Sequence, residues 1–434
     1  MEQKVSINSF LLIGISLILI GIFTLIGSVS LFKDVANVMF LIMLIISIKN
    51  LISFLVKKQE DKFKLLTKIT IVILSLIACI FKDYSVAIVP IIFAIYLLIN
   101  SVANLFNFIL LKLNKLRGGY SNLLIGLIYL ISGIMILFGP LIHLNIVLKI
   151  LGVYSLLLGI SSVFDYIDFN NYIKIPRIKV NMPFIIEAFI PISVLQKINK
   201  QYNIENDLYE KINKKDNIEP DIEILIHVTE DGYGKLGHMD ICYKDEIISY
   251  GNYDYNNNKL NGVFGTGVVF IAKPKLKYIR FCIEDTKKTI FAFGLKLKKE
   301  EKLEIEKRIK KLKEELKKWD PPYKEAIKKH KKVSNIKDYS SRLYKYMKPE
   351  FYKFKSGKNK VFFILKNNCV SLANKIIGPT LNKHTKMYGI LTPGTYYDYL
   401  EREYMKKSSI VITKKIYNKY NIDNYDLKNK KNML

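Results

Sequence analysis

The sequence predicts a multi-domain protein in which a six-helix transmembrane bundle precedes an α+β domain. Half of the 434 residues are hydrophobic and the mean hydropathy is positive, at +0.15, yet the formal net charge is +29. These values fit together only if apolar and charged residues occupy different parts of the chain. Residues 1–164 carry 13 basic and 5 acidic residues, whereas the other 270 carry 54 and 33. A chain of this length also exceeds one ordinary domain.

This composition excludes several classes of protein. A chain that is half hydrophobic is not disordered, and four cysteines in 434 residues cannot hold a disulfide scaffold together. The lysine excess accompanies many Ile and Asn residues, which is typical of codons rich in A and T. We therefore expect a lipid bilayer, and no nucleic acid, among the partners.

Six apolar stretches fill the first third of the chain and predict three helical hairpins. Each stretch approaches the roughly 20 residues that a helix needs to cross about 30 Å of hydrocarbon. The predicted spans cover residues 9–32, 35–56, 65–81, 84–111, 122–139 and 141–164. The first is too long for a signal-peptide core, so we expect no cleaved targeting segment.

Basic residues in the short loops predict the orientation. The loops after the second and fourth spans contain Lys57, Lys58, Lys62, Lys64, Lys112, Lys115 and Arg117. The other turns have only Lys33, Lys82 and His143 at or beside them. Because cytoplasmic loops are the basic ones, both termini are expected in the cytoplasm of a multi-pass protein, in a membrane that we expect to be a bacterial cell membrane.

A glycine repeat marks three of the spans. Each pair of glycines is seven residues apart, so both lie on one helix face and allow a neighbouring helix to approach closely. The pairs are Gly14 with Gly21, Gly126 with Gly133, and Gly152 with Gly159. We expect these faces to pack helices together, and they could also join two copies of the chain into a homo-oligomer. Asn100 and Asn104 are expected to form interhelical hydrogen bonds or to line a pathway.

The repeated signature Leu-x-Gly-x6-Gly-Ile resembles that of the HdeD-type acid-resistance membrane proteins. It runs from Leu11-Leu-Ile-Gly14 and recurs from Leu123-Leu-Ile-Gly126. The resemblance covers about residues 8–165 and implies a six-helix bundle rather than a particular activity.

The chain changes character after the last predicted span. Residues 182–195 form an apolar stretch that is too short to cross a membrane and that Glu187 and two prolines interrupt. It is expected either to lie at the membrane interface or to be buried in the next domain. The predicted domains are a transmembrane domain (1–165), a connector (166–221), an α+β domain (222–415) and a basic tail (416–434).

Short segments rich in Ile, Val, Phe and Tyr, separated by turn residues, predict the sheet of the second domain. The predicted strands cover residues 222–228, 237–243, 246–250, 267–271, 278–282 and 289–297. Residues 301–319 then place apolar side chains at spacings of four, three, four and three, which predicts an amphipathic helix against the sheet.

The segment from Lys366 to Pro379 carries the most chemical information, because it places Cys369 in the first turn of a predicted helix. Asn367 or Asn368 is a suitable cap, and Gly378-Pro379 is expected to end the helix. At such a position the helix dipole and free amides favour a nucleophilic thiolate. The alternative is that Cys369 is a small core residue, as we expect for the other three cysteines.

A thiolate nucleophile needs a base, and His238 near the start of a predicted strand is the candidate. Strand alternation places Asp240 on the same face. The group that orients the histidine should come from the next strand. If Lys244-Asp245 is a two-residue turn, that group is Ser249, whereas a three-residue loop gives Tyr250 and Asn252 instead. The sequence leaves both registers open.

A helix-borne cysteine after Asn, together with Gly-His-x-Asp-Ile on a hairpin strand, resembles the NlpC-type papain-like hydrolases. His238 precedes Cys369 by 131 residues, which is the chain order of the circularly permuted branch that includes relatives of lecithin:retinol acyltransferase. The resemblance covers about residues 222–415. It implies a papain-like α+β fold in which Cys369 is the nucleophile, His238 the base, and one of Ser249, Tyr250 and Asn252 the orienting group.

We expect neither a metal nor a cofactor. His238 and Cys242 are four residues apart on a strand, about 13 Å at roughly 3.3 Å per residue, which is too far to share an ion. The other histidines of this half, His227, His330 and His384, lack ligand spacing.

Two functions of different classes follow from these observations. The first is a membrane-anchored cysteine hydrolase or acyltransferase that attacks an amide, ester or thioester bond of a peptide, protein or lipid substrate. The alternative is a non-catalytic membrane stress-response protein whose cytoplasmic domain binds a partner or lipid. Residues 388–399 are expected either to form one wall of a substrate cleft or to pack in the core. The tail from residue 406 is expected to be solvated or to meet anionic lipid headgroups.

Overall fold

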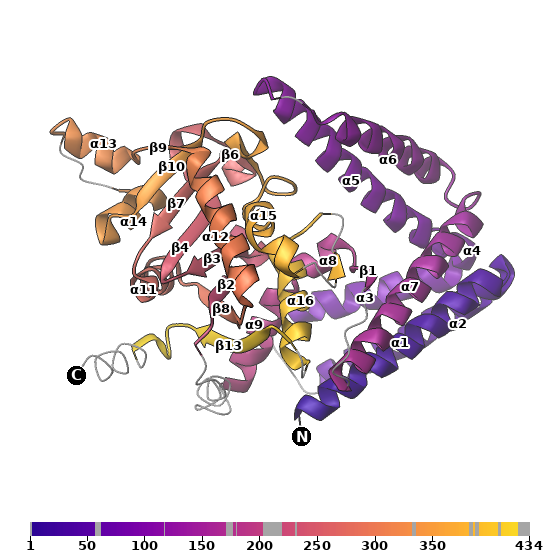
Figure 1. The fold of residues 1–434 in the computed structure, drawn as a ribbon. Coiled ribbons are helices and arrows are strands. Elements are labelled where there is room, and N and C mark those ends of the chain that lie inside the picture. The colour runs from indigo at the N-terminus through magenta and orange to yellow at the C-terminus, as the bar shows by residue number, and fades with distance from the viewer. Residues whose placement is uncertain are drawn as a thin grey trace. The chain divides into compact units, whose positions relative to one another are not determined.

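The computed structural model describes residues 2–56, 62–116, 118–170, 177–178, 180–202, 219–230, 232–331, 336–381, 385–386, 390–406 and 409–423. The chain divides into two compact units. One comprises residues 9–108 and 119–163 and is entirely helical. The other comprises residues 1–8, 109–118 and 164–434 and contains all of the described β-structure (Figure 1).

Long apolar helices dominate the first third of the chain. They are α1 (Glu2–Ile26), α2 (Val29–Val56), α3 (Lys62–Ile80), the short α4 (Lys82–Ser85), α5 (Ile88–Leu113), α6 (Tyr120–Phe138) and α7 (Leu144–Asn170). Among the described residues, five of them are long and apolar enough to cross a membrane: α1, α2, α5, α6 and α7. The prediction of a membrane-capable helical N-terminal part is therefore confirmed.

Two of the predicted spans differ in the structure. The span expected at 65–81 corresponds to α3, whose described apolar part, Leu65–Ile80, is shorter than the other five. The span expected at 84–111 does not begin as one helix, because α4 and a turn precede α5. The basic loop around Lys57 and Lys58, which carries part of the orientation argument, lies outside the described residues.

The glycine faces bring helices into close contact, as the repeat predicts. A Cβ atom at Gly14 of α1 would lie 3.0 Å from the carbonyl oxygen of Gly159 in α7, and one at Gly21 would lie 2.9 Å from that of Gly152. The hydroxyl of Ser155 also donates across this interface, to the Leu17 carbonyl at 2.8 Å. Side chains larger than hydrogen would force α1 and α7 apart.

The remaining glycine pair, Gly126 and Gly133 of α6, brings α6 close to α5 in the same way. A Cβ atom at Gly126 would lie 2.7 Å from Leu105, and one at Gly133 would lie 2.9 Å from Leu98. Ser101 donates a hydrogen bond to the Gly126 carbonyl at 2.8 Å. Helices of the same chain therefore pack on all three glycine faces.

The buried asparagines of α5 bond within their own helix rather than across to another. Asn100 donates to the Tyr96 carbonyl at 2.8 Å, and Asn104 donates to the Asn100 carbonyl at 2.7 Å. Each is an i to i−4 bond, which satisfies the side-chain amide without a second helix. The expected interhelical bonds are therefore not found at these two donors.

The second unit is built on an eight-stranded antiparallel sheet with the order β13-β8-β2-β3-β4-β7-β10-β9. Its strands are β2 (Ile222–Val228), β3 (His238–Tyr243), β4 (Glu246–Gly251), β7 (Val268–Ala272), β8 (Thr289–Leu295), β9 (Leu316–Lys318), β10 (Glu350–Phe354) and β13 (Val411–Tyr417). A small sheet joins β5 (Asn258–Lys259), β6 (Phe264–Thr266) and β11 (Val361–Phe363), and a parallel pair joins β1 (Arg177–Ile178) and β12 (Thr385–Lys386).

Helices cover both faces of the large sheet (Figure 1). They are α9 (Ile190–Tyr202), α11 (Lys275–Thr286), α12 (Lys299–Glu314), α14 (Tyr339–Met347), α15 (Cys369–Leu381) and α16 (Pro393–Met405). The short α8 (Phe184–Ala188) packs against α16, and α13 (Pro322–Lys328) packs against α14. Among the described residues, four 3₁₀ helices lie in the loops: Gly232–Leu236, Tyr255–Asn257, Leu260–Gly262 and Lys358–Lys360.

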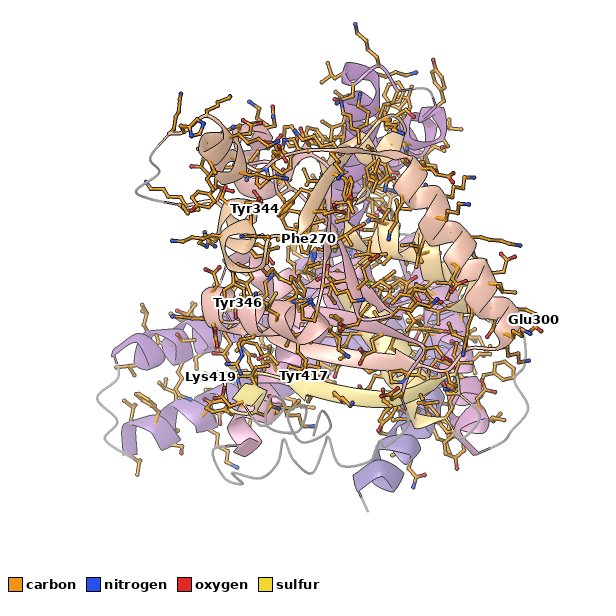
Figure 2. All side chains as sticks on the ribbon, turned by 60° about the vertical axis from the view of Figure 1, so that its left-hand side comes forward. Phe270, Glu300, Tyr344, Tyr346, Tyr417 and Lys419 are labelled. Carbon is orange, nitrogen blue, oxygen red and sulfur yellow. The ribbon has the colours of Figure 1, made fainter. Side chains whose placement is uncertain are left out.

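Alternation along the strands divides the interior into two cores. Ile224 and Ile226 of β2 face the core that α9, α12, α15 and α16 cover, whereas Leu225 faces the core that α11 and α14 cover. Phe270 and Tyr417 belong to the second core, and Glu300 is on the exposed side of α12 (Figure 2). The α+β architecture with an antiparallel sheet is thus confirmed.

Two predicted elements of this unit are wrong. The strand expected at 278–282 is part of α11, where the side chains at 278, 279, 281, 282 and 283 are buried. The helix expected at 301–319 ends at Glu314, and Leu316–Lys318 pair with β10 instead. The spacing between Leu312 and Leu316 fits a continuing helix as well as a helix followed by a strand, so periodicity could not separate them.

The apolar stretch at 182–195 contributes to the domain core rather than only to a surface. Ile192 and Leu195 are buried against the sheet, whereas Ile186 and Phe189 remain exposed. Most of the predicted linker after it (residues 203–218) and the end of the basic tail (residues 424–434) lie outside the described residues.

Candidate active site

Cys369 is the first residue of α15, directly after the loop that follows β11. The side-chain oxygen of Asn368 accepts the backbone N–H of Ser371 at 2.9 Å, so Asn368 is the helix cap. Its amide nitrogen donates to the carbonyls of Ile364 at 2.8 Å and Leu391 at 3.1 Å. Asn368 therefore fixes both the start of the helix and the two segments beside it. The cap prediction is confirmed.

The far end of α15 differs from the prediction. The helix passes through Gly378 and Pro379 and ends at Leu381. Arg308 of α12 donates to the Ile376 carbonyl at 3.0 Å and to the Thr380 hydroxyl at 3.2 Å. These bonds tie the last turn of α15 to α12, whereas the carbonyl that Pro379 leaves without a helical donor is that of Lys375.

His238 begins β3 after a glycine that the backbone requires. Gly237 has a φ of +79°, and a Cβ atom there would lie 3.1 Å from Pro393 at the start of α16. The chain can therefore turn sharply and pass close to α16 before the histidine. A fifth of the His238 side chain remains exposed.

The turn between β3 and β4 decides which side chain shares the face of His238. Lys244 and Asp245 both have positive φ, at 51° and 63°, and Tyr243 pairs with Glu246, so the turn has two residues. This is the register that the sequence associates with Ser249. The Ser249 hydroxyl lies 3.0 Å from Nε2 of His238.

The other two candidates for the orienting group lie elsewhere. Tyr250 points to the opposite face of β4 and donates to the Asn359 carbonyl at 3.0 Å. Asn252 donates to the Phe264 carbonyl at 3.1 Å. The two-residue turn thus rules out the register in which Tyr250 and Asn252 would face His238.

Asp240 makes the charged contact with His238. Its Oδ1 atom lies 2.8 Å from Nε2, and only 1% of the residue is exposed. The hydroxyl of Tyr253, after β4, also lies 3.0 Å from this nitrogen. The sequence places Asp240 on the correct face but assigns the orienting role to the next strand, and it does not identify Tyr253.

Electrostatics couples His238 to both Asp240 and Cys369. Burial lowers the pKa of His238, but the negative charges of Asp240 and Cys369, and the hydrogen bond that the ring donates to Asp240, raise this pKa to about 10. Burial would raise the pKa of Asp240, yet the charge of His238 beside it holds this pKa well below its usual range. At neutral pH the ring is therefore an imidazolium beside an ionised carboxylate.

The geometry leaves one nitrogen of His238 for the cysteine. The contacts with Asp240, Ser249 and Tyr253 all involve Nε2, and α15 packs against β3 and β4. Nδ1 is the nitrogen of His238 that these contacts leave for Cys369, a residue that is 6% exposed and belongs to the core on the α15 side of the sheet. This arrangement can hold a thiolate–imidazolium pair.

Two buried residues beside Asp240 were not identified from the sequence. The Tyr278 hydroxyl donates to Oδ2 of Asp240 at 2.6 Å, and Nε2 of His227 lies 2.9 Å from the same oxygen. Tyr278 was assigned to a strand that is in fact α11, and His227 lies on the preceding strand. A cross-strand histidine pair would have been a usable signal once β2 and β3 were aligned.

Residues 388–399 were expected either to form a cleft wall or to pack in the core, and different parts of the segment do each. The Leu391 carbonyl accepts from the helix cap Asn368, and Pro393 lies against Gly237, so the start of the segment borders Cys369 and His238. Tyr396 and Tyr397 are buried in the core. Residues 387–389 lie outside the described residues.

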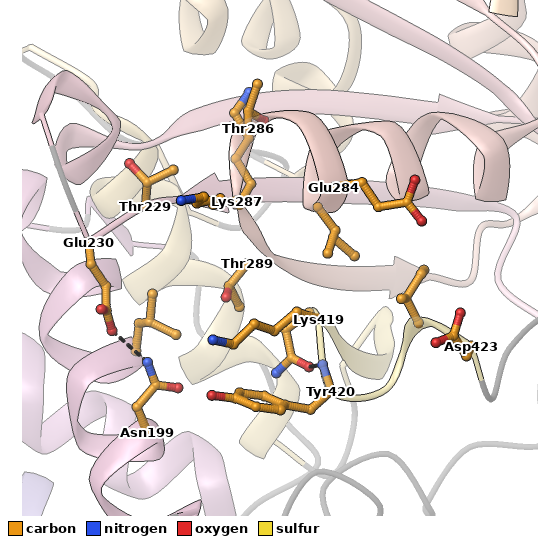
Figure 3. Close-up of a pocket in the computed structure, with 15 residues that line it drawn as sticks. Asn199, Thr229, Glu230, Glu284, Thr286, Lys287, Thr289, Lys419, Tyr420 and Asp423 are labelled. Carbon is orange, nitrogen blue, oxygen red and sulfur yellow. Dashed lines mark hydrogen bonds between the residues drawn. The ribbon is translucent and has the colours of Figure 1, made fainter. Parts of the chain in front are cut away.

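A cavity of about 950 Å³ opens at the ends of β2 and β8 (Figure 3). Its lining includes Thr229, Thr289, Lys287 and Lys419, and the acidic Glu230, which accepts a hydrogen bond from Asn199. Neither Cys369 nor His238 lines it. Within the described ranges, no three His, Cys, Asp or Glu side chains are grouped so that they could hold a metal ion.

Comparison with known proteins bears on the N-terminal half. Residues 69–138 and 124–181 match a family model described as a short repeat of unknown function, DUF308, the family to which HdeD belongs. The match supports the HdeD-type resemblance and the membrane association of this half. No curated protein matches the chain, and no solved structure does so either.

Proposed function

We propose that the protein is a membrane-anchored cysteine hydrolase or acyltransferase that acts on an amide, ester or thioester bond. The observation that carries this proposal is the placement of Cys369 in the first turn of α15, a helix that packs against β3 and β4, where Asp240 holds His238 at the start of β3. A buried core cysteine has no need of a histidine held as an imidazolium beside it.

In the acylation step, the Cys369 thiolate attacks the substrate carbonyl carbon and a C–S bond forms. The cap already holds the Ser371 amide, so the backbone amide of Cys369 at the helix terminus is the donor that would stabilise the oxyanion. His238 then gives the proton on Nδ1 to the leaving nitrogen, oxygen or sulfur as its bond to the acyl carbon breaks. Asp240 keeps the ring oriented through Nε2.

In the second step, a water or another acceptor attacks the thioester. His238, now neutral, takes the proton of the attacking group at Nδ1, and the C–S bond breaks to regenerate the thiolate. Attack by water makes the protein a hydrolase, and attack by an acceptor hydroxyl or amine makes it an acyltransferase.

The same proposal includes the finer architecture. We infer that the sheet and α15 form a permuted NlpC-type papain-like domain, and that α3 is a sixth span that completes three hairpins. With both termini in the cytoplasm of a bacterial cell, the substrates would be cytoplasmic peptides, protein tails or lipids of the inner leaflet. The opposite orientation would make cell-wall peptides the best candidates.

The test is alkylation of the detergent-solubilised protein with limiting iodoacetamide, a small probe chosen because Cys369 is only 6% exposed. Peptide mapping then gives the labelling rate of each cysteine. We expect Cys369 to react fastest near pH 7, and His238→Ala to slow it at least about tenfold. His330→Ala is the matched control, because His330 is exposed at the end of α13 and should leave the rate unchanged.

The alternative, non-catalytic function predicts a different result. If Cys369 of the folded wild type reacts no faster than buried Cys242 or Cys282, it is a core residue and the domain is better explained as a binding module. Slow labelling in both wild type and His238→Ala would therefore overturn the enzymatic proposal.

A further inference from the structure

A second histidine lies beside the candidate site and has no part in the mechanism above. His227 of β2 pairs directly with His238 of β3, so the two side chains project from the same face of the sheet. Their ring centroids are 5.7 Å apart with an interplanar angle of 67°. The His227 side chain is completely buried, whereas a fifth of the His238 side chain is exposed.

The two histidines share one carboxylate. Asp240 faces His238 with Oδ1, and its other oxygen, Oδ2, lies 2.9 Å from Nε2 of His227 and accepts a hydrogen bond from Tyr278. The Nε2 contact is short but is not aligned as a full hydrogen bond, and Nδ1 of His227 has no hydrogen-bond partner among the described residues. The ring therefore acts on Asp240 through the dipole of its N–H edge.

The charge state of His227 follows from its surroundings. The titratable groups that act on it are Asp240 and His238 from β3, Tyr278 from α11 and Lys288 from the turn before β8. Burial lowers the pKa of His227 to about 4, because the charges of Lys288 and His238 add to the burial effect and Asp240 offsets them only in part. At neutral pH His227 is thus neutral, and we assign its proton to Nε2 because Oδ2 of Asp240 lies 2.9 Å from that nitrogen.

We propose that His227 is a positioning residue that holds Oδ2 of Asp240, so that Oδ1 stays ionised and aimed at Nε2 of His238. A neutral donor does this without competing for the negative charge that keeps His238 protonated. A charged residue at position 227 would compete with His238 for Asp240. An apolar residue there would leave Tyr278, of the two side chains that face Oδ2, as the one that still contacts it. The inference rests on the proposed Cys369–His238 function.

The experiment is the pH profile of Cys369 alkylation by iodoacetamide between pH 5 and 10, in the full chain. His227→Leu removes the donor, whereas His227→Gln keeps an amide donor near the position of Nε2. We expect His227→Leu to move the midpoint of the profile upward by about one pH unit, a tenfold slower rate near pH 6, with the plateau above pH 9 within about twofold of wild type. His227→Gln should restore the wild-type midpoint.

Each other outcome has a definite meaning. A general defect of packing would lower the whole profile without moving its midpoint, and that result overturns the inference. If the wild type reacts fast at Cys369 and His227→Leu has the same midpoint, the inference is wrong while the proposed function stands. If wild-type Cys369 is unreactive, the proposed function itself fails.

A further variant covers the case in which His227→Leu does not fold. His227→Asn keeps the polarity but places its amide nitrogen near the position of Nδ1, away from Asp240. Compared with His227→Gln, it should show the raised midpoint, and equal midpoints for the Asn and Gln variants would contradict the inference.

Discussion

Oδ1 of Asp240 lies 2.8 Å from Nε2 of His238, two residues earlier on the same strand. A strand residue and its i+2 neighbour project from one face, so this pair needs no other element to bring it together. The carboxylate is buried and ionised, and its charge contributes to the high pKa of His238. Orientation and charge of the candidate base are therefore built into one short stretch of β3.

Replacing Asp240 should affect thiol reactivity more than replacing Ser249. Asp240→Asn keeps the shape of the side chain but removes the charge, so the pKa of His238 falls and less thiolate forms at neutral pH. We expect the alkylation rate of Cys369 at pH 7 to drop about 10- to 100-fold. Ser249 contacts the same nitrogen without a charge, so Ser249→Ala should cost less than about fivefold. Equal effects of both variants would show that charge is not the deciding property.

Acid should destabilise the folded domain through His227. Its pKa is lowered to about 4 in the folded state, whereas an unfolded histidine titrates near 6.5. Between these values the unfolded chain binds the proton more tightly, so the free energy of unfolding decreases as the pH falls from about 6.5 to 4. The loss attributable to this residue is at most about 3 kcal/mol.

The measurement for this effect is thermal unfolding of wild type and His227→Gln across pH 4–7. Glutamine does not titrate, so the variant should lose less stability on acidification than wild type does. Parallel curves for the two proteins would mean that His227 is not buried in its neutral form.

The sequence predicts those parts of the site that depend on local rules, and fails where distant segments meet. The cap of α15 depends on residue types within a few positions, so the sequence narrows it to Asn367 or Asn368, whereas it leaves open the two-residue turn that brings Ser249 to His238. His227 and Tyr278 reach Asp240 from β2 and α11, and no local pattern indicates that meeting. The position of Tyr278 is hard to predict for a further reason, because its short apolar segment fits both the period of a strand and that of a helix.

Removing the cap of α15 should destabilise the domain and slow the cysteine. Asn368→Ala loses the bond to the Ser371 amide and both bonds to the Ile364 and Leu391 carbonyls. We expect a loss of about 1–2 kcal/mol in the free energy of unfolding and slower alkylation of Cys369. Asn368→Asp is the matched control, since its carboxylate still accepts from Ser371. If its stability falls as far as that of the alanine variant, the two carbonyl bonds outweigh the cap.

The close contact of α1 with α7 should not tolerate a side chain at the shared glycines. A Cβ atom at Gly159 would lie 2.7 Å from the Gly14 carbonyl oxygen, so Gly159→Val must separate the two helices. We expect a loss of about 1–3 kcal/mol, measured as a lower unfolding temperature in detergent. Gly139→Ala is the control, because its nearest contact would be 3.4 Å, to Ile142, and it should unfold near the wild-type temperature. An unchanged Gly159→Val protein would mean that this glycine face is not a packing surface.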